Sequence, residues 1–149
     1  ILKVYTRPND LEARGHMMSA AAMGATAFQK GLGAMHALAH PIGPIHHTHH
    51  GTTNAVVMRK VVEFNREAIE TKIISLARYL NIPGGFEGFC DFISETNHAL
   101  GIPKTLTDLG VQDPNIDRLV RDALADPSCG GNPIEMTESN TRKLLEDCL

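Results

Sequence analysis

Histidine is the residue type whose number and spacing in this sequence could do chemistry. Of the 8 histidines among 149 residues, six lie between positions 36 and 50, interleaved with glycine and proline. His36 and His40 stand four residues apart, so on a helix they would share one face and could bind one metal ion together. An isolated pair with this spacing is more often hydrogen-bonded to carbonyl groups, but the density of histidine here favours metal chemistry. The full cluster is His36, His40, His46, His47, His49 and His50.

The four later histidines of this cluster allow two interpretations. They could form an exposed loop that binds nickel or zinc ions weakly, in a non-enzymatic, His-rich metal-binding helical module. Alternatively, at least one of them points inward and completes a site with the helix that carries His36 and His40. Helical geometry alone favours His36 with His40 as the metal-binding pair, and spacing does not choose among the later residues. A degenerate helical domain kept for oligomerisation is a third hypothesis.

Composition excludes several classes of protein. The formal net charge is −3, from 14 Lys and Arg against 17 Asp and Glu, so the overall charge favours neither nucleic acid nor a membrane as a partner. No apolar run approaches the roughly 18–20 residues that span a bilayer. The 3 cysteines are an odd number without a CxxC pair, which argues against disulfides and a thiolate zinc site and predicts a cytoplasmic protein.

The elements that must position the histidines are predicted to be helices throughout, because apolar residues recur at a spacing near 3.6 and few segments alternate. We expect an all-α bundle of about six to seven helices and a single domain over residues 1–149. Residues 1–8 alternate in polarity and are expected to be extended or frayed. Residues 42–49 and 126–135 are predicted loops because they are rich in proline and glycine. The expected helices cover residues 11–30, 34–40, 50–64, 67–80, 86–100, 113–125 and 137–148.

The cluster also carries a resemblance. The run GLGAMHALAHPIGPIHHTHHGTTNAVV at 31–57 resembles the signature of the iron-containing alcohol dehydrogenase family, a metal-dependent group related to dehydroquinate synthase. The segments VVEFN at 61–65, LGIPKTLTDLGV at 100–111 and GGNP at 130–133 agree with it. The resemblance covers essentially the whole chain and implies the C-terminal helical domain of that family.

The resemblance implies a site with four protein ligands, one Asp and three His, for Fe²⁺, with Zn²⁺ as a strong competitor. Carried over by motif, the metal ligands in this chain are His36 and His50. His40 matches a histidine that lies beside the metal and the nicotinamide and could pass the alcohol proton to solvent. The family's Asp-x-x-x-His arrangement has no counterpart before His36, and neither does the dinucleotide-binding domain that holds NAD or NADP.

The activity implied is interconversion of an alcohol and an aldehyde by metal-assisted hydride transfer to and from NAD(P). The expected partner is a small-molecule alcohol or aldehyde, and the parent enzyme is expected to be a homo-oligomer. No cofactor-binding residue can be assigned within these 149 residues. The chain on its own is therefore expected to be inactive.

Overall fold

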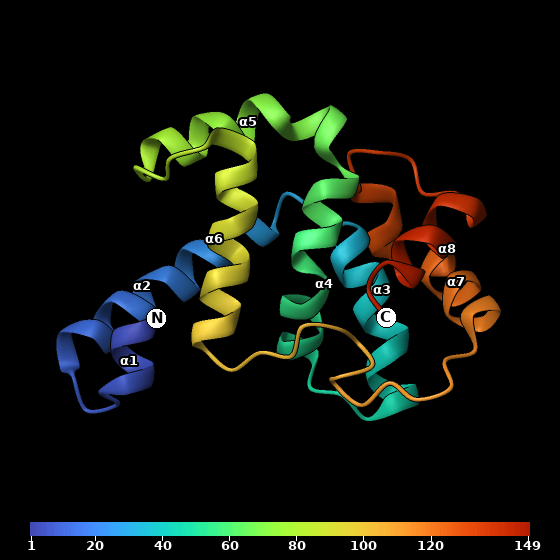
Figure 1. The fold of residues 1–149 in the computed structure, drawn as a ribbon, viewed down its shortest axis with the longest axis horizontal. Helices are drawn as coiled ribbons and strands as arrows, with labels where there is room; N and C mark the ends of the chain where they lie inside the picture. The colour runs from blue at the N-terminus through green and yellow to red at the C-terminus, as the bar shows by residue number, and fades with distance from the viewer. The chain divides into compact units, whose positions relative to one another are not determined.

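The structure is a computed structural model that describes all 149 residues. It confirms the all-α prediction, with eight α-helices, one short 3₁₀ helix and no β-strand (Figure 1). The chain divides into two compact units, Ile1–Gly31 and Leu32–Leu149. None of its helices combines the length and the apolar character needed to cross a bilayer.

The first unit contains two helices, α1 (Leu2–Thr6) and α2 (Leu11–Phe28). Residues 1–8 were expected to be extended or frayed, but Leu2–Thr6 form the short helix α1, with Tyr5 N–H bonded to the Ile1 carbonyl at 3.0 Å. Asp10 caps α2 by accepting a hydrogen bond from the Ala13 backbone N–H at 3.0 Å. Ala13 is the only buried residue of α2.

The second unit contains the remaining helices and all of the clustered histidines. Helix α4 packs against α3 and α6, α7 packs against α3 and α8, and α5 pairs with α6 (Figure 1). The hydrophobic core is contributed by α3, α4, α7, α8 and the connector after α6, and its largest buried side chains include Leu38, Ile42, Leu106, Leu119 and Leu145. The elements are α3 (Ala34–His46), α4 (His50–Phe64), α5 (Arg66–Tyr79), α6 (Gly85–Ala99), α7 (Ile116–Ala125), the 3₁₀ helix η1 (Pro127–Gly131) and α8 (Glu138–Glu146).

Helix α3 corrects the predicted stop at residue 40 and the predicted loop at 42–49. It continues through Pro41 and Pro44 to His46. Proline inside a helix removes a backbone donor and costs about 3 kcal/mol. The continued helix buries Ile42 completely and keeps Ile45 packed against the core, and this burial offsets the cost. His47 ends the helix in the left-handed region, with φ of 55°.

Two other boundaries also differ from those expected. Helix α7 begins at Ile116 rather than at residue 113, because Asp113 has a positive φ of 44° and Asn115 supplies the N-cap. The predicted loop at 126–135 contains the 3₁₀ helix η1, capped by Asp126. The helix expected over 137–148 is α8, and its N-cap Thr137 forms a capping box with Asn140.

Candidate functional site

The start of α3 is held by an amide lattice that fixes where His36 lies. Asn132 Oδ1 accepts hydrogen bonds from the Ala34 backbone N–H at 3.0 Å and from Asn65 Nδ2 at 3.0 Å. Asn132 Nδ2 donates to Asn65 Oδ1 at 2.8 Å. Asn65 is 4% exposed, so these polar groups have no alternative partner in water. The lattice therefore joins the first turn of α3 to the end of α4.

Two glycines allow the chain segments around this lattice to approach. A Cβ added at Gly131 would lie 1.9 Å from the backbone oxygen of Leu32. A Cβ added at Gly33 would lie 2.9 Å from Asn132 Oδ1. The GLG and GGNP segments are thus two sides of one close contact, which places the first turn of α3.

Three histidine rings meet on α3 and α4. The ring centroids of His36 and His50 are 5.3 Å apart, those of His40 and His50 are 5.4 Å apart, and those of His36 and His40 are 5.7 Å apart. His36 and His40 share a face of α3, and His50 is the first residue of α4. The turn between the helices brings His50 back to that face, because His47 is left-handed and His49, two residues later, caps α4.

The side-chain amide of Asn54 joins His36 and His50. Its Nδ2 lies 3.4 Å from Nε2 of His36 and 3.1 Å from Nε2 of His50. An amide nitrogen can only donate, so both Nε2 atoms accept and carry no proton in this arrangement. The Oδ1 atom of Asn54 is buried and has no hydrogen-bond partner. The lone pairs of the two Nε2 atoms and the unpaired Oδ1 of Asn54 therefore lie close together.

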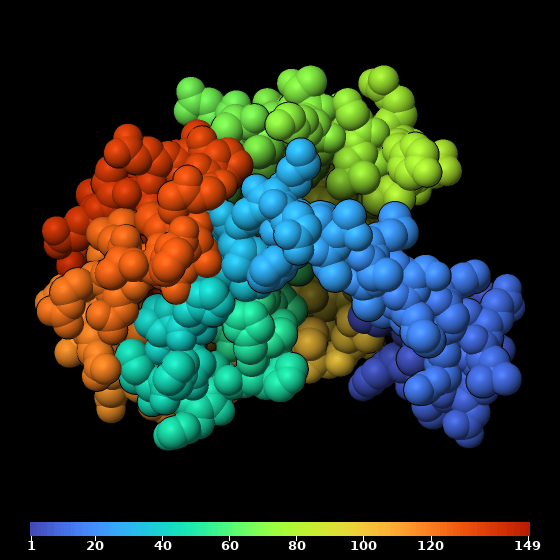
Figure 2. Space-filling view, turned by 180° about the vertical axis from the view of Figure 1, so that it is seen from behind, coloured from blue at the N-terminus to red at the C-terminus, as the bar shows by residue number.

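His40 has a different partner. Its Nδ1 lies 2.8 Å from Oδ2 of Asp126, the residue that also caps η1 through the Ser128 N–H at 2.8 Å. His40 and Asp126 line an open pocket of about 320 Å³, together with Arg118 and Asp122. In Figure 2 the teal surface of α3 adjoins the orange surface of the chain around α7, in agreement with the packing of these two helices. The His40–Asp126 pair is thus reachable from solvent.

Burial and neighbouring charges favour a neutral His36. Its pKa is lowered, first by burial of the ring and then by the positive charge that His50 and His40 carry when protonated; Asp126 opposes this only in part. Burial, the largest single influence on Asp126, raises its pKa, but the hydrogen bonds from Ser128 and His40 outweigh it and leave that pKa lowered. The site therefore pairs an unprotonated imidazole with a stable carboxylate.

The donor set fits a divalent cation bound through His36 and His50. Imidazole nitrogens bind metals in the neutral form, which is the form that the Asn54 contacts require. No group of three or more His, Cys, Asp or Glu side chains is arranged to hold a metal ion.

The structure separates the predicted histidines into two groups. It brings His36, His40 and His50 together, whereas His49 serves as the cap of α4 and accepts the Thr52 N–H at 3.4 Å. His46 is half-buried, and its Nε2 has no hydrogen-bond partner. Sequence reasoning missed Asp126, since its only local signal is an Asp-Pro pair before a glycine-rich segment.

Comparison with solved structures shows the class of protein to which the fold belongs. The fold matches that of 1,3-propanediol oxidoreductase with a TM-score of 0.93 and 28% identity, covering 99% of this chain and 41% of that one. It also matches sulfoacetaldehyde reductase from Bifidobacterium kashiwanohense, solved in complex with NAD⁺, with a TM-score of 0.84 and 22% identity, covering 99% of this chain and 39% of that one. The chain has the fold of the helical domain of such oxidoreductases.

Sequence comparison then gives the family. Residues 1–149 match the description "Fe-containing alcohol dehydrogenase family, C-terminal", and the chain belongs to that family. It is 36% identical to 4-hydroxybutyrate dehydrogenase of Cupriavidus necator over 94% of this chain, and 34% identical to lactaldehyde reductase of Escherichia coli K12 over 72% of this chain. The matched segments span 39% and 30% of those two proteins.

Proposed function

We propose that residues 1–149 form the metal-binding helical domain of an NAD(P)-dependent alcohol dehydrogenase that interconverts an alcohol and an aldehyde. The observation that carries this proposal is that Asn54 Nδ2 contacts Nε2 of both His36 and His50, at 3.4 Å and 3.1 Å. Two histidines 14 positions apart by number thereby present unprotonated nitrogens to one place. Family membership supports the same conclusion.

In this proposal His36 and His50 hold the ion, which is Fe²⁺ with Zn²⁺ as the competing ion. When bound, such an ion acts as a Lewis acid toward the substrate oxygen, and hydride transfer is the chemistry of the NAD or NADP cofactor. The role of this chain is to keep the two imidazoles neutral and oriented. The lowered pKa of His36, caused mainly by burial, serves the first purpose, and the amide lattice at Asn132 serves the second.

His40 is the proposed proton carrier. Donation of its Nδ1–H to Asp126 leaves Nε2 as an acceptor for the proton of the substrate hydroxyl. The carboxylate stabilises the imidazolium that then forms, and the open pocket beside the pair gives the proton a way to solvent.

The substrate class follows from the relatives, whose names include a 4-hydroxybutyrate dehydrogenase and a lactaldehyde reductase. We propose a small alcohol or aldehyde as the substrate, a homo-oligomeric parent enzyme and a cytoplasmic location. No residue of this chain is assigned to binding NAD or NADP.

Metal titration tests the proposal. We expect the 149-residue chain to bind Fe²⁺ under anaerobic conditions, or Zn²⁺, by calorimetry, and His36→Gln and His50→Gln each to weaken binding by about tenfold or more. His16→Gln, which changes an exposed residue of α2, is the matched control and should bind as the wild type does. The assignment fails if both site variants retain wild-type affinity while a variant lacking His46, His47 and His49 loses it; that result would support a non-enzymatic metal-binding module.

A further inference from the structure

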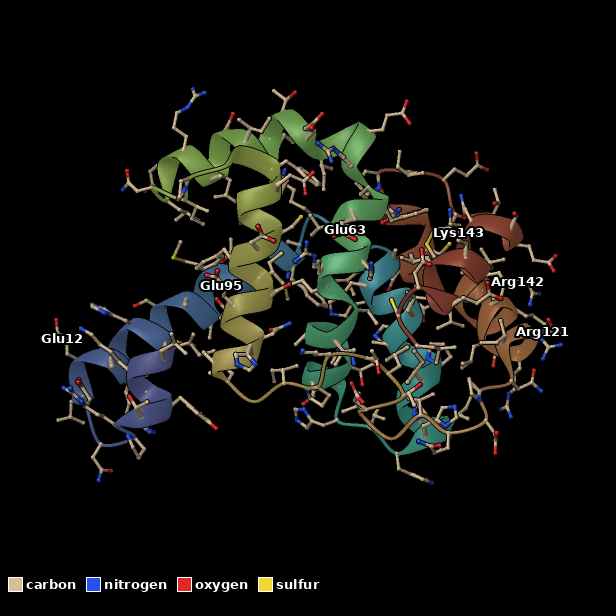
Figure 3. The ribbon with its side chains drawn as sticks, in the orientation of Figure 1. Glu12, Glu63, Glu95, Arg121, Arg142 and Lys143 are labelled. Carbon is tan, nitrogen blue, oxygen red and sulfur yellow. The ribbon has the colours of Figure 1, made fainter.

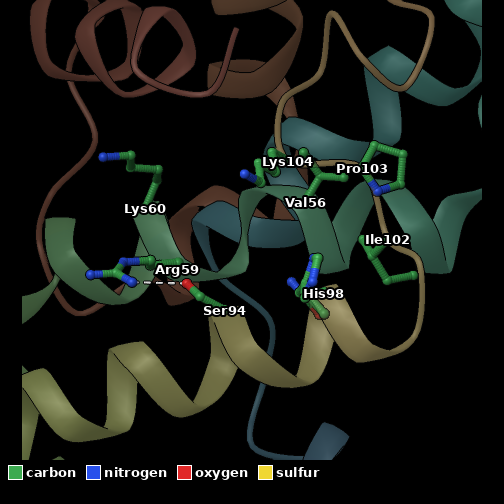
Figure 4. Close-up of a pocket in the computed structure, with 9 residues that line it drawn as sticks. Val56, Arg59, Lys60, Ser94, His98, Ile102, Pro103 and Lys104 are labelled. Carbon is green, nitrogen blue, oxygen red and sulfur yellow. Dashed lines mark hydrogen bonds between the residues drawn. The ribbon is translucent and has the colours of Figure 1, made fainter.

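A second pocket lies between α4, α6 and the connector that follows α6 (Figure 4). Its volume is about 280 Å³, and none of the residues that line it belongs to the histidine cluster. Pockets for drug-sized ligands span about 300–1,000 Å³, so this one suits a smaller molecule.

The charged side chains that line this pocket are all basic. Arg59 and Lys60 come from α4 and Lys104 comes from the connector, and no carboxylate lines the pocket. Arg59 forms ion pairs with Glu63 at 2.8 Å and Asp91 at 3.2 Å. These two carboxylates fix the Arg59 guanidinium in place.

The other cations are less fully neutralised. Lys60 has one carboxylate partner, Glu63 at 3.3 Å, which it shares with Arg59. Lys104 is exposed and makes no ion pair or side-chain hydrogen bond. Three cations thus stand against two carboxylates, which leaves the lining of the pocket with an excess of positive charge. A site of this kind favours an anion.

A hydrogen-bond donor and an apolar wall complete the pocket. Ser94 Oγ accepts a hydrogen bond from Arg59 at 2.8 Å, which leaves its O–H free to donate (Figure 4). Val56, Ile102 and Pro103 line the opposite part of the pocket with hydrocarbon. A bare inorganic anion would leave this wall in contact with water, whereas a short alkyl chain would cover it.

We propose that this pocket binds a short-chain monocarboxylate, with its carboxylate at Lys104 and the Ser94 hydroxyl and its alkyl chain against Ile102 and Pro103. The site is distinct from the histidine cluster, so the proposal does not depend on the proposed function. A carboxylate suits these two donors because it accepts through two oxygens. The volume of about 280 Å³ leaves room for a chain of a few methylenes.

Calorimetric and NMR titration with sodium butyrate tests the proposal on the 149-residue chain. We expect saturable binding, with amide shifts concentrated at Ser94, Asn97 and His98. Lys104→Gln should weaken it by about tenfold or more, because hydrogen bonds to charged groups are the strong ones. Affinity should rise from acetate to propionate to butyrate by about fourfold per methylene that becomes buried.

Lys143→Gln is the matched control, since Lys143 is an exposed, unpaired lysine on α8 that does not line the pocket (Figure 3). It should bind butyrate as the wild type does. The proposal is overturned if butyrate does not bind, if Lys143→Gln weakens binding as much as Lys104→Gln, or if Lys104→Gln has no effect. Inorganic phosphate binding as tightly as butyrate would equally overturn it, because the apolar wall would then play no part.

Discussion

The carboxylate of Asp126 lies 2.8 Å from Nδ1 of His40, although 86 positions separate the two residues in the chain. Histidine has two ring nitrogens, and the partner of one determines whether the other carries a proton. Because Asp126 accepts the Nδ1–H, Nε2 of His40 is the free acceptor. Asp126 is therefore a positioning residue for His40, set in place by its own role as the cap of η1.

Replacing Asp126 with asparagine should remove this control of the tautomer. An amide can offer either its oxygen or its NH₂ group to Nδ1, so imidazole ¹⁵N NMR of Asp126→Asn should show His40 as a mixture of tautomers. In an enzyme containing this domain, kcat should fall by about 10–100-fold with little change in KM. Asp122→Asn, which alters the same pocket without touching His40, should leave both measurements unchanged. A single unchanged tautomer in Asp126→Asn would contradict the assignment.

The same carboxylate should contribute to stability in a pH-dependent way. The pKa of Asp126 is lowered in the folded chain because hydrogen bonds from Ser128 and His40 outweigh the burial that raises it. Its contribution is therefore present above the unfolded pKa of about 3.9 and is lost as the pH falls through the lower folded value. In urea unfolding, the stability difference between wild type and Asp126→Asn should shrink between about pH 7 and about pH 3. A difference that grows on acidification would reverse the sign and contradict this account.

Adjacent glycines give a sharp test of the contact that places α3. Gly131→Ala would bring a Cβ to 1.9 Å from the Leu32 backbone oxygen, whereas Gly130→Ala would meet nothing within 4 Å. We expect Gly131→Ala to lower the free energy of unfolding by about 1–3 kcal/mol, and Gly130→Ala to change it by less than about 0.5 kcal/mol. Urea unfolding of the two variants measures this, and equal effects would show that the close approach is not needed.

Asn132→Ala should lower the free energy of unfolding, although Asn132 is only half-buried. It removes the acceptor of the Ala34 N–H and two of the hydrogen bonds of the buried Asn65 side chain, which keeps its bonds to the Val61 carbonyl and the Ile134 N–H. An unpaired buried polar group costs about 1–3 kcal/mol, so the loss of the Ala34 N–H acceptor should lower the unfolding free energy by about 1–3 kcal/mol. Gln112→Ala, which removes only an exposed contact at 3.5 Å, is the control and should be nearly neutral. If Asn132→Ala matches that control, the lattice does not hold α3.

Local patterns in the sequence predicted the helices well. Apolar spacing and caps such as Asp10 and Thr137 are properties of a few neighbouring residues, so the helix starts at 11 and 138 could be predicted closely. The continuation of α3 through Pro41 and Pro44 could not be predicted in this way. The burial of Ile42, which offsets the cost of the two prolines, depends on distant segments of the chain.

In the candidate site, too, contacts within one helix could be predicted from the sequence, and contacts between separate elements could not. His50 and Asn54 are four residues apart on α4, so their contact at 3.1 Å follows from helical geometry. The contacts of Asn54 with His36 and of Asp126 with His40 join separate elements. Spacing within a segment carries no information about such tertiary pairs, and only the motif resemblance linked His36 with His50.

The purified 149-residue chain should show no metal-dependent turnover by itself. It contains no β-strand, so it lacks the α/β fold on which dinucleotides bind in this type of enzyme, and no three of its side chains form a metal-holding group. Orienting a cofactor against a substrate contributes up to roughly 7–11 kcal/mol to lowering a reaction barrier, and nothing here supplies that positioning. The assay supplies Fe²⁺ or Zn²⁺, NAD(H) or NADP(H), and a series of short alcohols and aldehydes, and follows the absorbance of the reduced cofactor. Turnover that requires the metal and disappears in His36→Gln would show that the whole active site lies within these residues.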